Sequence, residues 1–479
     1  MALRTSHTPS AGRRRWPDYA AVWRWHFYAG LFCLPFICWL AVTGSVYLFR
    51  PDIEALLDRP YENLALEGPR AAPSAEAQAA IDAVPRSTFS RYEPPATPTS
   101  AAQVVVARGG NLFRVYVQPR TLAPMSIERD DHRIMELVSH LHGNLLIGDT
   151  GSIIVELAAS WAIVMVLTGL YLWWPRGRTG LGGVLYPRLS LRGRPFWRDL
   201  HAVTGLWVSV ITLFLLLSGL PWATSWGTYM TWARNLSAVT AGHPTWPVGA
   251  KQDPATVAGP RAPAGARPAM PGMSAAEMAA MSGAAPRAGG TPDLEALNRL
   301  VPLAAKLHPP RPIWIVAPAV GAREWTIESH VQDRPKRITY AATPDGQVTG
   351  ISDFAGQNIV DKVVAVTTAT HEGQLFGRLN QALLLATAAS LILVTISGTI
   401  MWWRRRPTNM LGAPPSVAQP QFKPLVTIGI VVLALLLPLL GLSLLLVAAF
   451  DLIVLSRLPR TQYWLGRSVE PIAKGHLRY

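Results

Sequence analysis

Long, largely apolar runs without charged residues alternate with polar segments along the chain. Five such runs lie at residues 27–49, 157–174, 202–226, 382–403 and 424–450. A transmembrane helix needs about 20 consecutive apolar residues, and each run is near or above that length. The pattern predicts a polytopic α-helical membrane protein and excludes a soluble enzyme.

The last apolar run is ambiguous. From Pro424 to Leu455 it is too long for one ordinary span and short for two, and Pro438 and Gly441 lie in its middle, where a kink or a turn fits. Basic residues after it favour a hairpin that returns to the cytoplasm. We therefore expect four core spans and a C-terminal hydrophobic block of one or two spans.

The formal net charge of +15 does not indicate a nucleic-acid partner, because many of the basic residues gather at the ends of apolar runs. These are Arg13, Arg14, Arg15, Arg24, Arg176, Arg178, Arg188, Arg192, Arg194, Arg198, Arg404, Arg405 and Arg406. By the positive-inside rule, their segments face the cytoplasm. This predicts a multi-pass protein of the bacterial inner membrane with a cytoplasmic N-terminus and an uncleaved first span. The long connections then lie in the periplasm.

A histidine pattern occurs twice in this chain. HxxxGL is followed, 17 residues after the histidine, by Thr-Gly or Ser-Gly; the members are His26 with Thr43-Gly44 and His201 with Ser218-Gly219. A second pattern, HxxxLxG, is followed by Thr-Gly or Ser-Gly and then Trp-Trp; its members begin at His142, with Thr168-Gly169, and at His371, with Ser397-Gly398. The chain therefore reads as two tandem copies of span, outer domain and span.

The outer segments each read as a helix followed by strands, which predicts two small α+β domains. Helices are expected at 75–83 and 294–307, and strands at 103–107, 113–117, 313–317, 325–330 and in a hairpin over 338–348. The full predicted order is tail 1–20, span 21–49, periplasmic domain 50–150, span 152–175, cytoplasmic loop 176–199, span 200–226, Pro/Ala/Met linker 227–292, periplasmic domain 293–378, span 379–403, cytoplasmic loop 404–423, C-terminal block 424–456 and tail 457–479.

The repeat predicts the depth of the four histidines. The two HxxxGL helices run in parallel, so His26 and His201 are expected near the inner face, just past Arg24 and Arg198. His142 and His371 precede descending spans and are expected near the outer face, in short helices that end where the chain turns at 148–151 and 377–378. A histidine at a membrane span is a candidate functional residue. For any one of them alone, a structural role is about equally favoured.

Two pairs of histidines indicate two separate sites. Two imidazoles without a nearby carboxylate make a poor zinc site, whereas a porphyrin supplies four nitrogens and needs only axial ligands. Gly30 and Gly205, one turn after His26 and His201, leave room for a flat macrocycle. The only cysteines, Cys33 and Cys38, lie inside the first span and exclude a disulfide framework or a cysteine-ligated cluster. No nucleotide-binding motif is present, so electrons must come from elsewhere.

These stretches resemble the PepSY-associated transmembrane proteins, the iron-regulated PiuB-type group that includes FoxB-like ferrisiderophore reductases. The likeness rests on 197–207, 142–148, 371–377 and the Trp-Trp-basic span ends. It implies PepSY folds for both outer domains and two haem b groups with His26, His201, His142 and His371 as axial iron ligands. It also implies a membrane-bound haem-dependent metalloreductase. Its acceptor is a ferric siderophore or other ferric chelate, and its donor a quinol or a cytoplasmic reductase.

Some alternatives remain open at this stage. His140 could replace His142 as a ligand, although its counterpart in the second copy, position 369, is not a histidine. A PepSY sensor or scaffold without redox activity would need only structural histidines. The methionines of the linker, Met270, Met273, Met278 and Met281, could select copper and make Cu(II) the substrate. Composition bias explains these methionines better. Transport is disfavoured because the spans carry few acidic residues.

Overall fold

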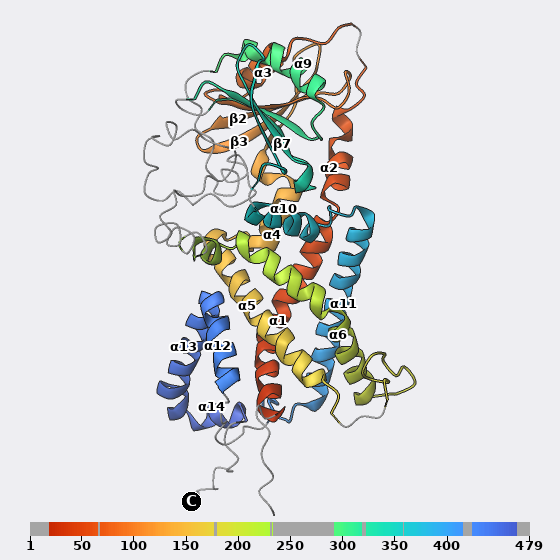
Figure 1. Ribbon diagram of the computed structural model, residues 1–479, viewed down its shortest axis with the longest axis vertical. Coiled ribbons are helices and arrows are strands. Elements are labelled where there is room, and N and C mark those ends of the chain that lie inside the picture. Colours follow the sequence, from red (N-terminus) through yellow and green to blue (C-terminus); the bar gives the residue numbers. More distant parts are fainter. Residues whose placement is uncertain are drawn as a thin grey trace, which may run out of the picture. The chain divides into compact units, whose positions relative to one another are not determined.

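The computed structural model describes residues 19–65, 68–176, 180–229, 232, 292–318, 322–357, 359–414 and 424–466. Within these ranges, five helices are long and apolar enough to cross a membrane. They are α1 (Tyr19–Tyr47), α5 (Gly148–Trp173), α6 (Arg194–Gly219), α11 (Arg378–Arg405) and α13 (Pro438–Ile453), the last counted together with the turn that follows it. Together with an antiparallel sheet, they make the chain a polytopic membrane protein (Figure 1). The linker methionines lie outside the described residues.

The chain divides into two compact units. The first contains residues 1–41, 153–217 and 387–479, and the second contains residues 42–152 and 218–386. The first unit is helical, whereas the second holds all the strands of the sheet.

The C-terminal apolar block breaks into two helices. α12 (Pro424–Leu436) and α13 pack side by side, and Leu437 between them leaves the helical conformation with φ −124° and ψ 81°. Pro438 begins α13, where its missing N–H is tolerated. α12 alone has 13 residues, too few to span a bilayer, whereas α13 with the following turn is long enough. α14 (Pro459–Trp464) follows η7 (Leu455–Arg457).

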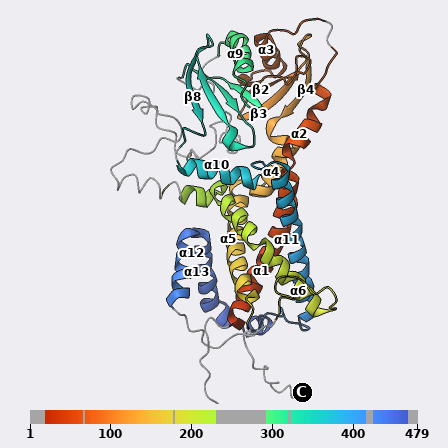
Figure 2. The ribbon, with the colours of Figure 1, turned by 45° about the vertical axis from the view of Figure 1, so that its right-hand side comes forward.

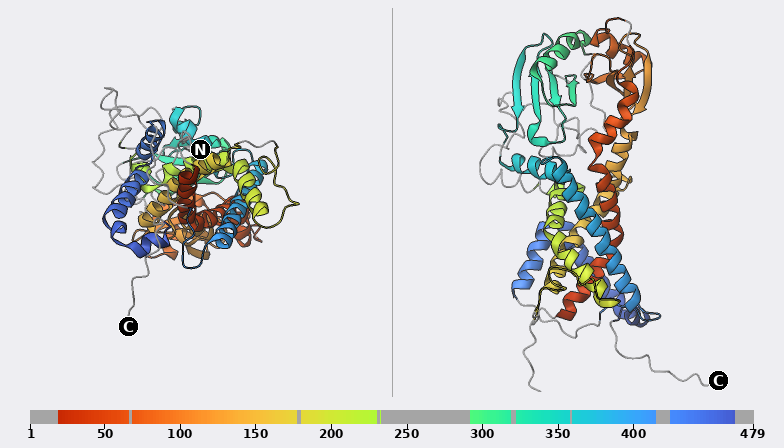
Figure 3. Two further views of the ribbon diagram at one scale, coloured as in Figure 1. Left: turned by 90° about the horizontal axis from the view of Figure 1, so that it is seen from below. Right: turned by 90° about the vertical axis from the view of Figure 1, so that its right-hand side faces the viewer.

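The second unit is built on one eight-stranded antiparallel sheet with the order β4-β3-β2-β1-β5-β6-β7-β8. The strands are β1 (Thr88–Glu93), β2 (Ala102–Arg108), β3 (Asn111–Val117), β4 (Pro124–Arg129), β5 (Ile313–Val316), β6 (Trp325–Ser329), β7 (Ile338–Ala342) and β8 (Val348–Asp353). β1 pairs with β5, so the two expected α+β domains share one sheet. Figure 3 shows the two halves side by side.

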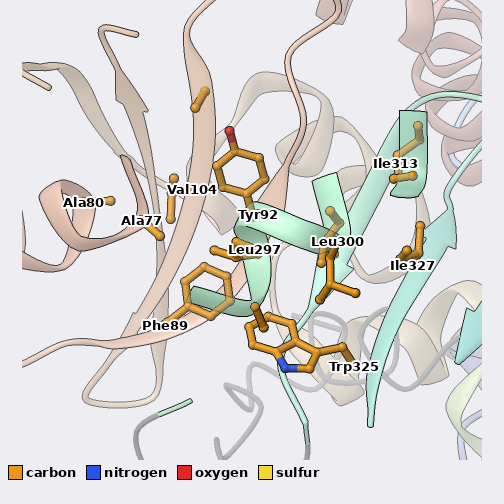
Figure 4. Close-up of a cluster of buried hydrophobic side chains, with 14 of the residues drawn as sticks. Ala77, Ala80, Phe89, Tyr92, Val104, Leu297, Leu300, Ile313, Trp325 and Ile327 are labelled. Atoms are coloured by element: carbon orange, nitrogen blue, oxygen red, sulfur yellow. The ribbon is translucent and has the colours of Figure 1, made fainter. Parts of the chain in front are cut away.

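One hydrophobic core serves both halves of the sheet. α3 (Pro73–Ala83) and α9 (Leu297–Leu307) cover the same face, and Asn298 of α9 accepts a hydrogen bond from the Ser74 backbone N–H of α3 at 3.1 Å. Figure 4 shows Phe89 and Tyr92 of the first half close to Leu297, Leu300 and Trp325 of the second. The shared burial of these large side chains holds the two halves together.

An ionic cluster lies on the other face of the sheet. Asp130 accepts hydrogen bonds from Arg114 at 3.0 Å and from Arg91 at 2.5 Å. Burial alone raises the pKa of Asp130, but the two guanidinium groups outweigh it and hold the pKa well below its usual range. Arg91 also lies 4.1 Å from the ring centre of Trp314, so the cluster links β1 to β5.

Two short helices of this unit carry histidines at or near their C-terminal ends. α4 (Ile134–Asn144) ends at Leu145, which is left-handed with φ 55°, and the chain then turns through Gly148 at φ 62° into α5. α10 (Ile359–His371) is followed by Gly373 and Gly377, both with positive φ, before α11. Figures 1 and 2 show α4 and α10 next to each other. The remaining described elements of this unit are α2 (Arg50–Asp58), η1 (Arg59–Tyr61), η2 (Asp130–His132), η3 (Leu220–Trp222), η5 (Leu294–Ala296) and η6 (Arg334–Lys336).

Candidate functional site

The four histidines selected from the repeat lie on four different helices. His26 is on α1 and His201 on α6, both in the first unit. His142 is on α4 and His371 on α10, both in the second unit. The structure thus assigns the two expected pairs to different units.

The rings of His26 and His201 lie next to each other in a T-shaped, edge-on arrangement. Their centres are 6.3 Å apart and their planes are 81° apart. A coordinating imidazole nitrogen lies about 2.0–2.1 Å from its metal and roughly 1.1 Å from its own ring centre, so two imidazoles on opposite sides of one ion have ring centres about 6.3 Å apart. The observed separation would allow both imidazoles to hold a single metal ion between them.

The proton on each of these two rings can be assigned from its partner. Nδ1 of His26 donates to the Met165 carbonyl at 3.0 Å, and Nδ1 of His201 donates to the Val394 carbonyl at 2.9 Å. Because a carbonyl only accepts, the hydrogen bond puts the proton on Nδ1 and leaves the Nε2 lone pair available to a metal. This is the usual arrangement for a histidine whose orientation is fixed by its surroundings.

A hydroxyl lies beside Nδ1 of all four histidines, and it always belongs to a Thr-Gly or Ser-Gly pair of the repeat. The Nδ1-to-oxygen distances are 3.2 Å for His26 and Thr168, 3.3 Å for His201 and Ser397, 3.0 Å for His142 and Thr43, and 2.8 Å for His371 and Ser218. The sequence marked these pairs by their equal spacing, but it did not indicate that their hydroxyls contact the histidines.

The glycine of each pair lies against the edge of the same ring. A Cβ atom at Gly169, Gly398, Gly44 or Gly219 would lie 3.1, 3.2, 3.1 or 3.6 Å from Cε1 of His26, His201, His142 or His371, respectively. At three of these positions a side chain would push the ring away. Each histidine therefore rests in a seat, defined here as the hydroxyl and the adjacent glycine of one pair.

The surroundings of the first pair fit a flat macrocycle. A Cβ at Gly205 would meet no atom within 4 Å, and one at Gly30 would meet only Met165 Sδ at 3.9 Å. Across the described part of the chain, no group of three or more histidine, cysteine, aspartate or glutamate side chains could hold a metal ion. Two imidazoles with open space beside them suit a porphyrin, which supplies its own four nitrogens.

His140 has a different environment from His142. Its Nδ1 lies 3.1 Å from Asn144 Nδ2, one turn along the same helix. Of these two histidines, only His142 contacts a hydroxyl and a glycine of the repeat, as the other three histidines of the two pairs do. Among the remaining histidines, His330 stacks on Trp314 with ring centres 3.4 Å apart and lies 2.9 Å from Glu328.

The long apolar helices, the sheet of the second unit and the repeated histidine seats define a multi-pass membrane protein with PepSY-type domains. The family described as the PepSY-associated TM region has a model that matches residues 23–405. The chain belongs to this family. A comparison with curated proteins found no match.

Proposed function

We propose that the chain is a di-haem reductase of the bacterial inner membrane that passes electrons to a ferric siderophore or other ferric chelate in the periplasm. The electrons would come from the cytoplasmic side or from the quinol pool. The observation that carries the proposal is the 6.3 Å separation of the His26 and His201 ring centres, which suits two imidazoles on one haem iron. A bound haem supplies one-electron transfer through the ferric and ferrous states of its iron.

The protein's contribution at the inner site is to orient two neutral imidazoles. The Met165 and Val394 carbonyls hold the Nδ1 protons, so both Nε2 atoms would be able to bind a haem iron without losing a proton. The low-dielectric surroundings of a membrane span favour such neutral ligands over charged ones.

The second site is assigned to His142 and His371, because their seats repeat those of the first pair. The two pairs belong to different units, and the two sites are proposed to be separate and connected in series. The basic residues at the ends of the spans support electron transfer from the cytoplasm to the periplasm, because they favour a cytoplasmic side for His26 and His201.

The acceptor is proposed to be Fe(III) bound by hard oxygen donors. Reduction to Fe(II) weakens such a complex and releases the iron. The sheet of the second unit is proposed to lie in the periplasm and to form the wall of the acceptor site, because it belongs to the same unit as His142 and His371.

The proposal is tested by the spectrum of the purified, full-length protein. We expect a Soret band, α-bands after dithionite reduction, two haem b per chain, and reoxidation of the reduced protein by a ferric chelate. His308→Ala provides a control for histidine removal, because His308 is exposed on the sheet unit. A folded, membrane-inserted and colourless preparation would contradict the proposal.

The glycine of a seat should be as important for haem retention as the histidine that it supports. In Gly398→Val, the new side chain would begin 3.2 Å from the His201 ring, and overpacking of about 1–3 kcal/mol corresponds to roughly 5- to 150-fold weaker retention of one haem. Haem content per chain measures this. Gly429→Val is the matched control, because a Cβ there would meet nothing within 4 Å. Equal haem loss in both variants would refute the role of the seat.

A further inference from the structure

An arginine of the sheet connects His371 to the segment that forms its seat. Trp222 lies in η3, three residues after Gly219 of that seat. The guanidinium carbon of Arg334, in η6, is 4.8 Å from the centre of the Trp222 ring. The same guanidinium donates to Glu372 at 3.1 Å, and Glu372 directly follows His371. Arg334 therefore joins the helix that carries the histidine to the segment that carries its seat.

The seat of His142 has a similar arrangement. Tyr47 lies three residues after Gly44 of this seat, at the end of α1. Arg50 donates to the Tyr47 hydroxyl at 3.0 Å and to the Glu136 carboxylate at 2.6 Å. Glu136 belongs to α4, the helix that carries His142. Arg50 thus joins the histidine helix to the end of the helix that carries the seat.

Each set of three residues is called a clamp here, and the two clamps are Tyr47–Arg50–Glu136 and Trp222–Arg334–Glu372. The arginines and glutamates of the clamps do not occupy equivalent positions. Arg50 begins α2, whereas Arg334 lies between β6 and β7. Glu136 precedes its histidine by six residues, and Glu372 follows its histidine by one. Repetition of the sequence alone would place them at equal offsets, so the shared arrangement indicates a common requirement of the two seats.

The two clamps differ in how far they are sheltered from water. The side chains of Arg334 and Glu372 are 8% and 14% exposed, and those of Arg50 and Glu136 are 24% and 31% exposed. Ion pairs at the surface contribute little, whereas removal of one partner from a buried pair leaves an uncompensated charge. A planar guanidinium can also stack on an aromatic ring while it pairs with a carboxylate. The clamp of His371 should therefore have the larger effect.

We propose that Arg334 and Arg50 are positioning residues for the outer haem, which is the haem assigned to His142 and His371. Each arginine holds its histidine helix against the segment that carries the seat, and so fixes the imidazole in the orientation that the haem iron needs. This inference rests on the proposed function. Arg334 belongs to the sheet, so the sheet also contributes to the geometry of the outer site.

The test measures the outer haem of the purified, full-length protein. In Arg334→Gln we expect this haem to dissociate roughly 10- to 100-fold faster, as for the loss of a hydrogen bond between charged groups. Part of it should become high-spin in the ferric state, and its midpoint potential should rise, because a weakened imidazole ligand stabilises ferric iron less. The inner haem should be unchanged. Arg50→Gln should affect the same haem to a smaller extent.

Arg70→Gln is the matched control for the loss of a sheltered ion pair. Arg70 pairs at 2.9 Å with Glu76, which is fully buried, and both residues belong to the second unit but to neither clamp. This variant should lower the thermal stability and leave the spin state, potential and dissociation of the outer haem unchanged. Arg334→Lys retains the charge and should give an intermediate rate. Adding Glu372→Gln to Arg334→Gln should change little further, because both substitutions break the same pair.

The possible failures are distinguishable. Wild-type dissociation of the outer haem from Arg334→Gln overturns this inference alone, and so does an equal acceleration in Arg70→Gln or an equal loss of both haems from Arg334→Gln. If Arg334→Gln retains no outer haem, hydrogen exchange at residues 368–372 should still be faster in its haem-free form than in the haem-free wild type, and equal exchange overturns the inference. A folded wild type that binds no haem overturns the proposed function and this inference together.

Discussion

Alanine in place of His201 is expected to reduce the purified protein from two haems per chain to one, and alanine in place of His26 is expected to remove the same haem. The two rings are 6.3 Å apart and share the proposed iron, so the loss of either leaves an incomplete ligand pair. The second site is proposed to be formed by His142 and His371, whose seats consist of Thr43-Gly44 and Ser218-Gly219 and contain neither substituted residue.

Haem content and a redox titration together measure this outcome. Each single variant should retain one redox component, with the midpoint potential of the same haem in both variants. The His26→Ala/His201→Ala double variant should lose no more haem than either single variant, because both changes remove one site. Equal loss of both haems from either single change, in a stable and membrane-inserted protein, would contradict the assignment of the pairs.

Alanine in place of His371 is expected to block the oxidation of the inner haem from the periplasmic side. The experiment uses right-side-out vesicles with both haems reduced in advance. A membrane-impermeant ferric chelate should oxidise the outer haem of the wild type first and the inner haem only through it. Without His371 the outer site lacks one of its two ligands, so the inner haem should stay reduced. The rate should fall by at least two orders of magnitude, because direct contact with the oxidant is excluded.

Time-resolved absorbance in the α-band region follows both haems during this reaction. His308→Ala, in which an exposed histidine of the same unit is removed, should show the wild-type rates. A membrane-permeant oxidant should still oxidise the inner haem of His371→Ala, which shows that this haem remains competent. If the impermeant chelate oxidises the inner haem of His371→Ala at the wild-type rate, the two sites are not in series.

The membrane spans were predictable from the sequence because burial in lipid demands long apolar helices, whatever the tertiary contacts. The break in the C-terminal block was predictable only as a possibility. Pro438 allows a turn or a kink, and the choice depends on α12 packing against α13, which no local pattern encodes.

The strands of the sheet were also predictable from the sequence only in part. The strands over 103–107 and 113–117 were expected and lie within β2 and β3, whereas β1 and β4 were not. β1 carries Arg91, which is 3% exposed, and a register shift between Phe89 and Arg91 disturbs its alternation. β4 is an edge strand that begins with Pro124. Buried charge and edge position both remove the alternating pattern by which strands are recognised.

Some features of the candidate site were likewise determined by the sequence, and others only by the tertiary structure. The sequence by itself determined which histidines repeat, their spacing and their grouping into two pairs, because equal offsets along equivalent helices need no knowledge of packing. Only the tertiary structure showed which hydroxyl and which glycine contact each histidine ring. His26 rests on Thr168-Gly169 of α5, and His142 rests on Thr43-Gly44 of α1, so each histidine is supported by a pair from a different helix. Contacts between helices depend on how their faces meet, and the spacing within one helix does not specify this.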